Sequence, residues 1–332
     1  MSIVRESEPP GFIDNSIEFL RPDPDGFRQY VREHKQRALV SKLVDEREAV
    51  AAFVEDGDYL VYDCNYLQRG PASLIRELIR QRRRDLWVCA KFTYVDLALL
   101  VEAGCVARAD VGYFGSQGPM FSRAAEAGGL KFYEYSNAAL TLRLRAGSQG
   151  VSFIQTRSFG GTDGYRYSAA TTITDPYTGG PAVLLPALNP DVALIHVHEA
   201  DVYGNARVFG TGIAHIETAL ASKKVILSTE RIIDTEEIRR NPGLTSIPWF
   251  VVDAVVLAPY GAYPGSCQGV YSSDAEHTAE VFGALRQDRV SEYLEKWVFS
   301  VSNHEAMLER RVGLKKLLDL RDRVRIQEGY HA

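Results

Sequence analysis

The sequence predicts an α/β protein with an open, mostly parallel sheet and helices on both of its faces. Short runs rich in β-branched and aromatic residues alternate with segments in which apolar residues recur every three to four positions. Such alternation is typical of strands joined by crossover helices, which cover both faces of a parallel sheet. The 332 residues are enough for one large domain of this kind or for two.

The first half of the chain begins with a polar, proline-bearing stretch. We expect residues 1–25 to form an arm that either wraps a partner subunit or frays. Residues 27–53 carry apolar side chains at helical spacing, which predicts a helix. The stretch 55–64 begins with an acidic turn and is then predicted to form a strand. Helix 71–84 follows, because Pro71 suits its first turn. Strands are then expected at 86–90, 111–113 and 130–135, alternating with helices at 95–103, 120–127 and 138–146.

The second half starts with a section rich in glycine, serine and tyrosine at 147–180, which we expect to be a long loop. Further elements are expected as strands at 182–185, 192–198, 224–227 and 250–257 and as helices at 215–221, 235–240 and 275–311. We therefore divide the chain into an N-terminal arm at 1–25, an α/β domain at 26–275 and a helical C-terminal extension at 276–332.

Charge and cysteine content exclude several classes of protein. With 38 basic and 43 acidic side chains the net charge is −5, so no global field attracts nucleic acid or an anionic membrane. The four cysteines have neither CxxC spacing nor the density of a disulfide scaffold, which favours reduced thiols. The N-terminus lacks the apolar run of a signal peptide, and no stretch approaches the ~20 apolar residues of a membrane helix. We therefore expect a cytoplasmic protein.

The segment 226–277 holds the strongest local signal for a binding edge. It contains a strand, a charged turn, the apolar strand VVDAVVL and the loop APYGAYPGSC. Ligands of open α/β sheets collect at the carboxyl ends of strands, where this loop is expected. The loop offers no obvious acid, base or nucleophile, so we expect it to shape an interface.

The turn at 62–71, between a strand and a helix, is a candidate binding site. Backbone N–H groups at the start of a helix suit a carboxylate or a thioester oxygen. Arg69 either holds an acid substrate through two parallel hydrogen bonds or is a surface arginine beside a tight turn. The turn lacks the GxGxxG fingerprint of dinucleotide-binding proteins.

The stretch 157–167 is a second candidate. Gly160 and Gly161 let a backbone approach a ligand closely, and Thr162 can shape the loop through its hydroxyl. The loop is therefore either a ligand loop or a structural turn.

Two histidines raise the question of a metal site. His196 and His198 alternate with apolar residues on one strand, with Glu199 and Asp201 at its end. HxH with nearby carboxylates lacks a third ligand at a defined spacing. We favour one histidine hydrogen-bonded in the core and a hairpin-like loop at 202–210, and we expect no metal.

Glu134 is a candidate for auxiliary acid–base work. It lies late in a predicted strand, and Ser136 or Asn137 is expected to cap the next helix. A partly buried carboxylate has the raised proton affinity that such chemistry needs. The alternative is a carboxylate paired with an arginine such as Arg143. These residues alone indicate an α/β enzyme or enzyme subunit that acts on a small acid.

Five stretches carry a resemblance to a known family. They are VEDGDYL at 54–60, LPALNPDVALIH at 185–196, TERIIDTEEIRRNP at 229–242, IPWFVVDAVVLAPYGAYPGSCQGVY at 247–271 and EKWVFSVSNHEAML at 295–308. Loops match as well as strands, and loops are less constrained by packing than core segments. From about residue 56 to residue 313, the chain resembles the α subunit of glutaconate CoA-transferase, a family I CoA-transferase.

The resemblance implies a homologous β chain in an α2β2 or larger assembly. It places the catalytic glutamate, which becomes a glutamyl-CoA thioester, on that β chain, so this chain supplies no nucleophile. CoA then passes by a ping-pong route from an acyl-CoA to the enzyme and on to a small acid, a dicarboxylic acid being one candidate. No permanently bound cofactor is implied. The residues expected to contact the acid and the thioester are Asn65, Gln68, Arg69, Phe92, Ser116 and Gln117.

Other members of the family leave two further activities open. Some resemble hydrolases that open a ring of a β-diketone acyl-CoA, with a glutamate at the position of Asn137 and an acidic residue at that of Glu134. The asparagine counts against a hydrolase. Others resemble glutaconyl-type decarboxylases, which replace the β-chain glutamate. A third hypothesis is a non-catalytic CoA-ester binding protein that acts without a partner.

Overall fold

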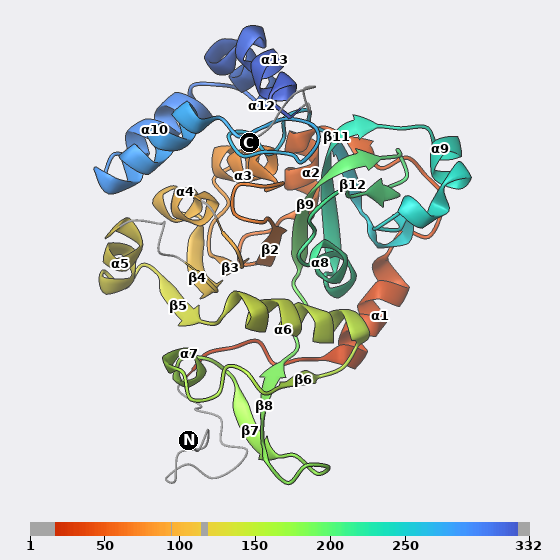
Figure 1. The fold of residues 1–332 in the computed structure, drawn as a ribbon, viewed down its shortest axis with the longest axis vertical. Coiled ribbons are helices and arrows are strands. Elements are labelled where there is room, and N and C mark those ends of the chain that lie inside the picture. The colour runs from red at the N-terminus through yellow and green to blue at the C-terminus, as the bar shows by residue number, and fades with distance from the viewer. Residues whose placement is uncertain (1–16, 94, 114–118, 325–332) are drawn as a thin grey trace, which may run out of the picture.

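A nine-stranded, mostly parallel sheet forms the centre of the computed structural model, which describes residues 17–93, 95–113 and 119–324 (Figure 1). Neighbouring strands run parallel in the order β1-β12-β11-β9-β2-β3-β4-β5, and β10 pairs antiparallel with β9. The strands are β1 Leu43–Val44, β2 Tyr59–Asp63, β3 Leu86–Ala90, β4 Val106–Val111, β5 Lys131–Glu134, β9 Val192–Ala200, β10 Ala206–Arg207, β11 Lys224–Ile232 and β12 Ala254–Leu257. The predicted fold class is confirmed.

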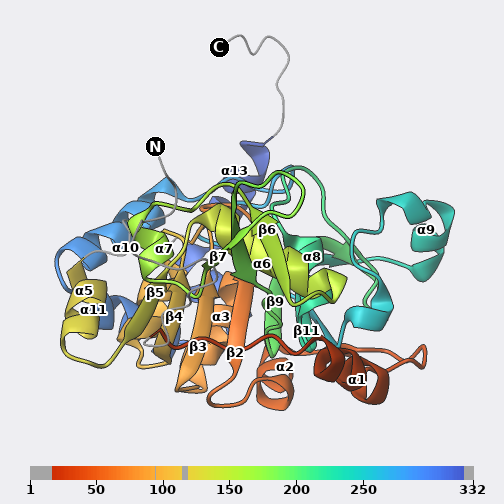
Figure 2. The ribbon, with the colours of Figure 1, turned by 90° about the horizontal axis from the view of Figure 1, so that it is seen from below.

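Helices cover both faces of this sheet, which explains why its central strands β2, β3 and β9 are buried along nearly their whole length. Alternate residues of a strand point to opposite faces. Leu60 and Tyr62 of β2 therefore pack into one core with α3 and α4, whereas Val61 packs into a second core with α6 and α8. Figure 2 shows α6 and α8 lying across the second face.

The helices begin mostly where the sequence supplies a capping side chain. Asp45, for example, accepts a hydrogen bond from Glu48 N at 2.7 Å and starts α2. The helices are α1 Pro24–His34, α2 Glu46–Phe53, α3 Ala72–Arg80, α4 Asp96–Glu102, α5 Pro119–Glu126, α6 Asn137–Gln149, α7 Asp163–Arg166, α8 His215–Ala221, α9 Thr235–Arg240, α10 Ala275–Arg286, α11 Val290–Leu294, α12 His304–Met307 and α13 Leu314–Asp322. None of the helices in the described ranges has both the length and the apolar character needed to cross a membrane.

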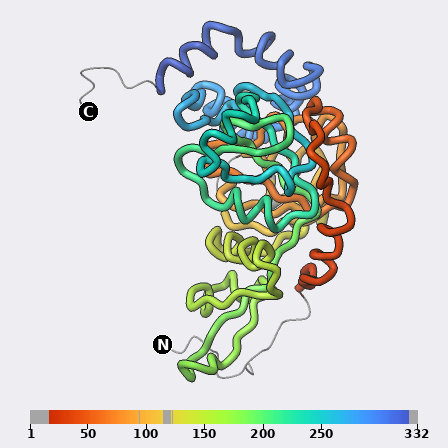
Figure 3. Tube along the Cα trace, turned by 90° about the vertical axis from the view of Figure 1, so that its right-hand side faces the viewer, coloured from red at the N-terminus to blue at the C-terminus, as the bar shows by residue number. Residues whose placement is uncertain are grey.

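The section 147–180 is not the long loop that its composition predicts. Strands β6 (Phe153–Thr156), β7 (Thr171–Thr174) and β8 (Pro181–Pro186) form a separate antiparallel sheet in the order β6-β8-β7. Threonine and isoleucine favour these strands, and the many glycines hide that signal in the overall composition. The small sheet and the C-terminal helices lie at opposite ends of the long axis (Figure 3).

Three expected elements differ from the observed ones. The helix expected at 27–53 is split into α1 and α2, because Asp45 caps a new helix and β1 adds a strand beside β12. The strand expected at 111–113 ends at Val111 instead of starting there. The helix expected at 275–311 is broken into shorter helices, the first break lying beside Asp288, whose φ is 58°. The domain boundaries at residues 25 and 275 stay predictions.

His277 ties the C-terminal helices to the loop after β12. Its Nδ1 lies 2.9 Å from the hydroxyl of Tyr263 and its Nε2 lies 2.8 Å from that of Tyr293. Its ring also stacks on Trp297, with 3.8 Å between ring centroids. Burial first, and then the charge of Arg76, lower the pKa of His277 to about 3.

The lowered pKa makes the stability of the fold depend on pH. An unfolded chain protonates His277 near pH 6.5, whereas the folded chain does so near pH 3. The stability contributed by the neutral ring is therefore present above pH 6.5 and is lost as the pH falls towards 3. We expect Tm to fall between pH 6.5 and 4, and we expect His277→Gln to lower Tm at pH 7 but to weaken this acid dependence. His34→Gln, at an exposed position, is the control; parallel Tm curves for His277→Gln and the unchanged protein would contradict the prediction.

Candidate functional site

The carboxyl ends of β2, β3, β4 and β5 bring most of the predicted site residues to one edge of the sheet. Asn65 and Gln68 exchange two backbone hydrogen bonds of 3.0 Å and so close the tight turn after β2. Tyr66 N in this turn donates to Phe92 O, after β3, at 2.8 Å. Phe92 N in turn donates to the Asn137 side-chain oxygen at 2.8 Å. These contacts link the ends of β2 and β3 to the start of α6. Ser116 and Gln117 lie outside the described residues.

Asn137 is the first residue of α6 and uses its side chain to hold Phe92. Ser136 is the cap of this helix, because its hydroxyl accepts a hydrogen bond from Ala139 N at 3.0 Å. The side-chain oxygen of Asn137 is half-buried beside the end of β3. At this position the asparagine positions the backbone of Phe92, and its amide is not an acid or a base.

Glu134 is exposed at the end of β5, which differs from the partly buried position that the sequence predicts. The alternative pairing with Arg143 is also wrong. Arg143 is buried, and its Nη1 lies 2.7 Å from a carboxylate oxygen of Asp110. The same oxygen accepts from the hydroxyl of Tyr59 at 2.5 Å. Asp110 is the buried partner because β4 carries it into the second core, whereas β5 is an edge strand.

A buried ion cluster lies directly beneath the turn after β2. Asp63, the last residue of β2, is fully buried, and its two oxygens lie 2.7 Å from Lys91 Nζ and 2.7 Å from Arg69 Nη2. Burial alone would raise the pKa of Asp63, but Lys91 and Arg69 together lower it below its usual range. Asp63 is therefore ionised and holds both cations inside the protein.

Arg69 is turned into the core, so the alternative of a surface arginine beside a tight turn is wrong. Its Nη1 donates to His196 O at 3.0 Å, and its backbone N–H donates to Ser266 O at 2.8 Å. Because both Nη atoms bond protein groups, we expect Arg69 to position the turn. Direct anchoring of an acid by Arg69 stays a prediction.

Three bulky residues at this edge have backbone conformations that side chains disfavour. The φ angles are 55° at Tyr66, 56° at Arg69 and 49° at Phe92. Each such backbone conformation lowers the stability of the fold by about 1–3 kcal/mol and persists only where surrounding contacts hold the residue in place. Here the ion cluster of Asp63 holds Arg69, and the hydrogen bond that Phe92 N donates to Asn137 holds Phe92. Strain of this kind is concentrated at functional sites, which favours this edge as the site.

The stretch before α7 lies beside β5 at the same edge. Phe159 stacks on Tyr135, the residue after β5, with 5.9 Å between centroids and 6° between planes. Thr162 caps α7 by accepting from Tyr165 N at 3.2 Å. Thr162 therefore shapes the turn, as one alternative predicts, while Gly160 and Gly161 lie in the same turn. A ligand-binding role of these three residues stays a prediction.

His196 and His198 are both buried and hydrogen-bonded in the core. His198 bonds Gln268 O at 2.9 Å and accepts from Phe209 N at 3.2 Å. Glu199 pairs with Arg207, and Asp201 Oδ1 accepts from three consecutive backbone N–H groups in the turn before β10. The preferred interpretation expected one core histidine, and the structure has both in the core; the expected hairpin is confirmed by the pairing of β9 with β10.

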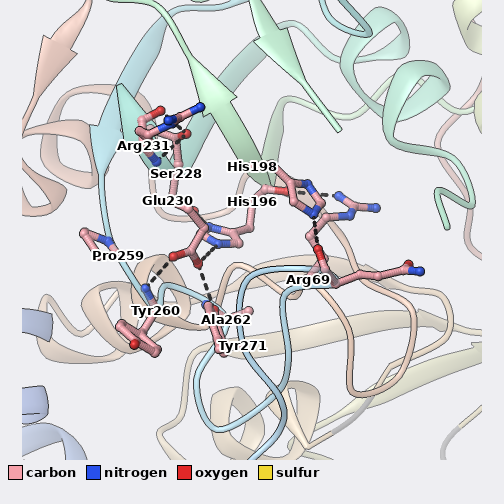
Figure 4. Close-up of polar contacts among 12 residues, drawn as sticks. Arg69, His196, His198, Ser228, Glu230, Arg231, Pro259, Tyr260, Ala262 and Tyr271 are labelled. Atoms are coloured by element: carbon pink, nitrogen blue, oxygen red, sulfur yellow. Dashed lines mark hydrogen bonds and ion pairs between the residues drawn. The ribbon is translucent and has the colours of Figure 1, made fainter. Parts of the chain in front are cut away.

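Glu230 of β11 is the polar residue of this region that the sequence interpretation missed. It receives hydrogen bonds from His196 Nε2 at 2.6 Å, Tyr271 Oη at 2.8 Å and Tyr260 N at 2.7 Å (Figure 4). Gly261 lies so close that a Cβ there would be 2.5 Å from His196 Cε1. The loop after β12 is thereby fixed against β9 and β11. Asp63 and Lys91 are marked by a charged residue that directly follows an apolar run, and Glu230 follows such a run after Ser228 and Thr229.

His196, Glu230 and Cys267 also place one ligand atom each within 4.8 Å of one another. A metal ion bound by His196 Nε2 and Glu230 would have to replace their 2.6 Å hydrogen bond, on a carboxylate oxygen that also accepts from Tyr271. The donor set therefore fits a polar core network better than a metal site.

The cysteines are not suited to act as nucleophiles. Cys64, Cys89, Cys105 and Cys267 are free and buried. Burial raises the pKa of each of these thiols, to about 12 for Cys89 and Cys105. At neutral pH the thiolate, which is the reactive form, is therefore scarce.

Comparison with known proteins gives one consistent family. The model of the coenzyme A transferase family matches residues 45–258. The glutaconate CoA-transferase of Acidaminococcus fermentans has one subunit that is 29% identical over 88% of this chain and 98% of its own length. The crystal structure of that organism's glutaconate coenzyme A-transferase aligns with a TM-score of 0.81 and 28% identity, covering 88% of this chain and 98% of the other.

Two other similar proteins are named for activities other than CoA transfer. A crystal structure of a variant of the decarboxylase AibA/AibB aligns with a TM-score of 0.68 and 31% identity, covering 77% of this chain and 98% of that chain. The cholesterol ring-cleaving hydrolase IpdA subunit of Rhodococcus jostii is 31% identical over 59% of this chain and 71% of its own length.

Asp63→Asn tests the ion cluster beneath the site. The change leaves Lys91 and Arg69 buried without their counter-charge, and breaking a buried pair in this way costs about 3–5 kcal/mol. We expect a loss of that size in the free energy of unfolding, measured by urea denaturation. Asp56→Asn is the matched control, because Asp56 forms an exposed pair with Arg84 and exposed pairs contribute about 0–1 kcal/mol. Equal losses for the two variants would contradict the assignment.

Proposed function

Because the chain belongs to the coenzyme A transferase family, we propose that it is the α subunit of a heteromeric CoA-transferase. In this proposal the complex moves CoA between an acyl-CoA thioester and a small carboxylic acid. The observation that carries the proposal is the match to one subunit of glutaconate CoA-transferase over 98% of that subunit's length, in sequence and in fold. Because that subunit is one part of the named relative, a homologous β subunit is the proposed partner.

The proposed reaction is a ping-pong exchange through the partner. A glutamate carboxylate of the β chain attacks the thioester carbonyl, and the CoA thiolate leaves. The thiolate then attacks the glutamyl carbonyl of the mixed anhydride, which forms a glutamyl-CoA thioester and releases the first acid. The second acid reverses these steps and leaves as the new acyl-CoA. The buried, unreactive thiols of this chain are consistent with a nucleophile on the partner.

This chain is proposed to supply one wall of the site, at the carboxyl ends of β2 to β5. The turn with Asn65 and Gln68 would orient the acid, with Phe92 beside it. Their backbones are held by the Asp63 ion cluster and by Asn137, so the wall is rigid before the substrate arrives. Backbone donors that stabilise the negative oxygen of the tetrahedral intermediate would be shared between the two chains.

A hydrolase or a decarboxylase is the second candidate, because relatives with these names reach 31% identity, although they align with a smaller share of this chain than the glutaconate CoA-transferase does. Asn137 stands where a ring-opening hydrolase is expected to have a glutamate, and its side chain holds Phe92. This makes a hydrolase that depends on that glutamate the weaker candidate. Decarboxylation depends on a residue of the partner and is tested by the same experiment as transfer.

Trapping of the covalent intermediate tests the proposed function. We expect the purified complex, incubated with acyl-CoA and then with borohydride, to carry one reduced glutamate on the β chain. Mass spectrometry of peptides from both chains locates it, and the same incubation without acyl-CoA is the control.

The same preparations separate the alternatives. If the reaction is transfer, acyl-CoA consumption stops after the first turnover unless an acceptor acid is present. Steady consumption without an acceptor, together with no modified glutamate, would replace transfer by hydrolysis or decarboxylation. Ester binding by this chain alone, with no turnover by the complex, would favour a non-catalytic binding protein.

A further inference from the structure

A cavity of about 820 Å³ lies away from the site described above, towards the other edge of the sheet. Its walls are the end of β12 with the loop that follows, the start of α2, and the helical segments from α12 to α13. α2 packs against α3 and β12, and α12 packs against α3, so these walls are tied to one another (Figure 1). Small-molecule sites have volumes of about 300–1,000 Å³, so this cavity has the size to hold a small molecule whole.

Much of the cavity wall is apolar. Val256, Ala258 and Leu308 line it and are buried, whereas Leu257 and Leu314 line it and are 51% and 72% exposed. Leu257 ends β12 and Leu314 begins α13, so the two exposed leucines belong to different walls. Covering such side chains with an apolar group is favourable, because it removes apolar surface from water. The wall therefore favours a ligand with an apolar body.

Carboxylates outnumber cations on the exposed part of the lining. Asp45, Glu305 and Glu309 are exposed there, and within the described ranges none of them forms an ion pair. Among the described residues that line the cavity, Arg47 is the one with a cationic side chain. The opening of the cavity therefore carries an excess of negative charge, which attracts a cation and repels an anion.

The buried charged groups of the lining do not cancel this excess. Glu77 pairs with Arg80, whose Nη1 lies 3.1 Å from a Glu77 oxygen, so this pair adds no net charge. His304 Nε2 lies 2.9 Å from Pro259 O. Burial first, and then Arg76, lower the pKa of His304 well below its usual range, so its ring is neutral.

Glu46, the first residue of α2, supplies a buried carboxylate oxygen to the cavity. Its Oε1 is buried, and none of the described groups donates a hydrogen bond to it. Burial, the largest cause, raises the pKa of Glu46, whereas Ser73, Arg76 and Arg80 oppose this. The Nη atoms of Arg76 bond other protein groups, and Arg80 pairs with Glu77. A buried carboxylate oxygen without a donor is unfavourable, and a cationic N–H group from a ligand would relieve it.

We propose that this cavity binds a small organic cation that carries a primary ammonium group on an apolar body. The ammonium group would donate to Glu46 Oε1, while the apolar body covers Leu257 and Leu314. An ammonium group has three donors, so it can serve Glu46 and a carboxylate of the opening together. The same negative charge disfavours carboxylic acids and phosphates. The proposal does not depend on the proposed function, because the cavity shares no residue with the edge from β2 to β5.

Three probes with the same six-carbon chain test the proposal: hexylammonium, 1-hexanol and hexanoate. In calorimetric titrations of the full-length protein, we expect hexylammonium to bind at least about 10-fold more tightly than 1-hexanol, and hexanoate not to bind. Glu46→Gln should weaken hexylammonium binding about 10- to 100-fold, as the loss of a hydrogen bond between charged groups implies, and should leave 1-hexanol binding unchanged. Glu48→Gln, exposed on the same helix and outside the lining, is the matched control.

Leu257→Lys gives a second comparison if Glu46→Gln does not fold. It changes an exposed side chain and places a like charge in the lining, so most of the hexylammonium binding should be lost. Leu244→Lys, at a comparably exposed leucine outside the lining, should not have this effect.

Equal affinities for hexylammonium and 1-hexanol, or equal effects of Glu46→Gln and Glu48→Gln, would overturn the proposal. So would the absence of hexylammonium binding. Binding by this chain alone that is lost in a complex with a partner chain would also overturn it, because the partner would then occupy the cavity.

Discussion

The buried carboxylate of Asp63 is the constraint on which the candidate site depends. A fully buried charge has to be neutralised by partners within hydrogen-bond distance, and Asp63 is neutralised by Lys91 and Arg69. Lys91 directly precedes Phe92, and Arg69 ends the turn after β2. The ends of two neighbouring strands are therefore pulled towards one point. The disfavoured φ angles of Arg69 and Phe92 are the local consequence.

A second buried carboxylate, Glu230, fixes the other side of the same edge. It holds the loop after β12 through Tyr260 and Tyr271, and it holds His196 of β9. The carbonyl of His196 then accepts a hydrogen bond from Arg69. The two networks therefore meet at one hydrogen bond across β2 and β9, where the strand order reverses. In the proposed function this edge is one wall of a site shared with a partner chain, and such a wall needs this rigidity, because its loops would not be closed by the partner until assembly.

The sequence predicted the main elements where the pattern of apolar residues is regular. The strands β2, β3, β9 and β11 and helices such as α8 and α9 follow directly from periodicity. It failed at 147–180, where threonine-rich strands lie among glycines, and at 27–53, where a capping Asp45 interrupts one helical pattern. The average composition of a long section does not reveal strands of four residues. Such short strands are stabilised by pairing with a distant strand, here β8, and this pairing leaves no local pattern.

The sequence by itself determined the α/β architecture and the resemblance to CoA-transferases. The spacing of apolar residues and the similar sequence segments can both be recognised without knowledge of contacts. The resemblance also pointed to Asn65, Gln68 and Phe92, which the structure places at the ends of β2 and β3. Only the tertiary structure decided that Arg69 turns inward and that Asp110, not Glu134, partners Arg143. The physical reason is that burial and charge pairing act between residues far apart in the chain, and spacing along the sequence carries no measure of those distances.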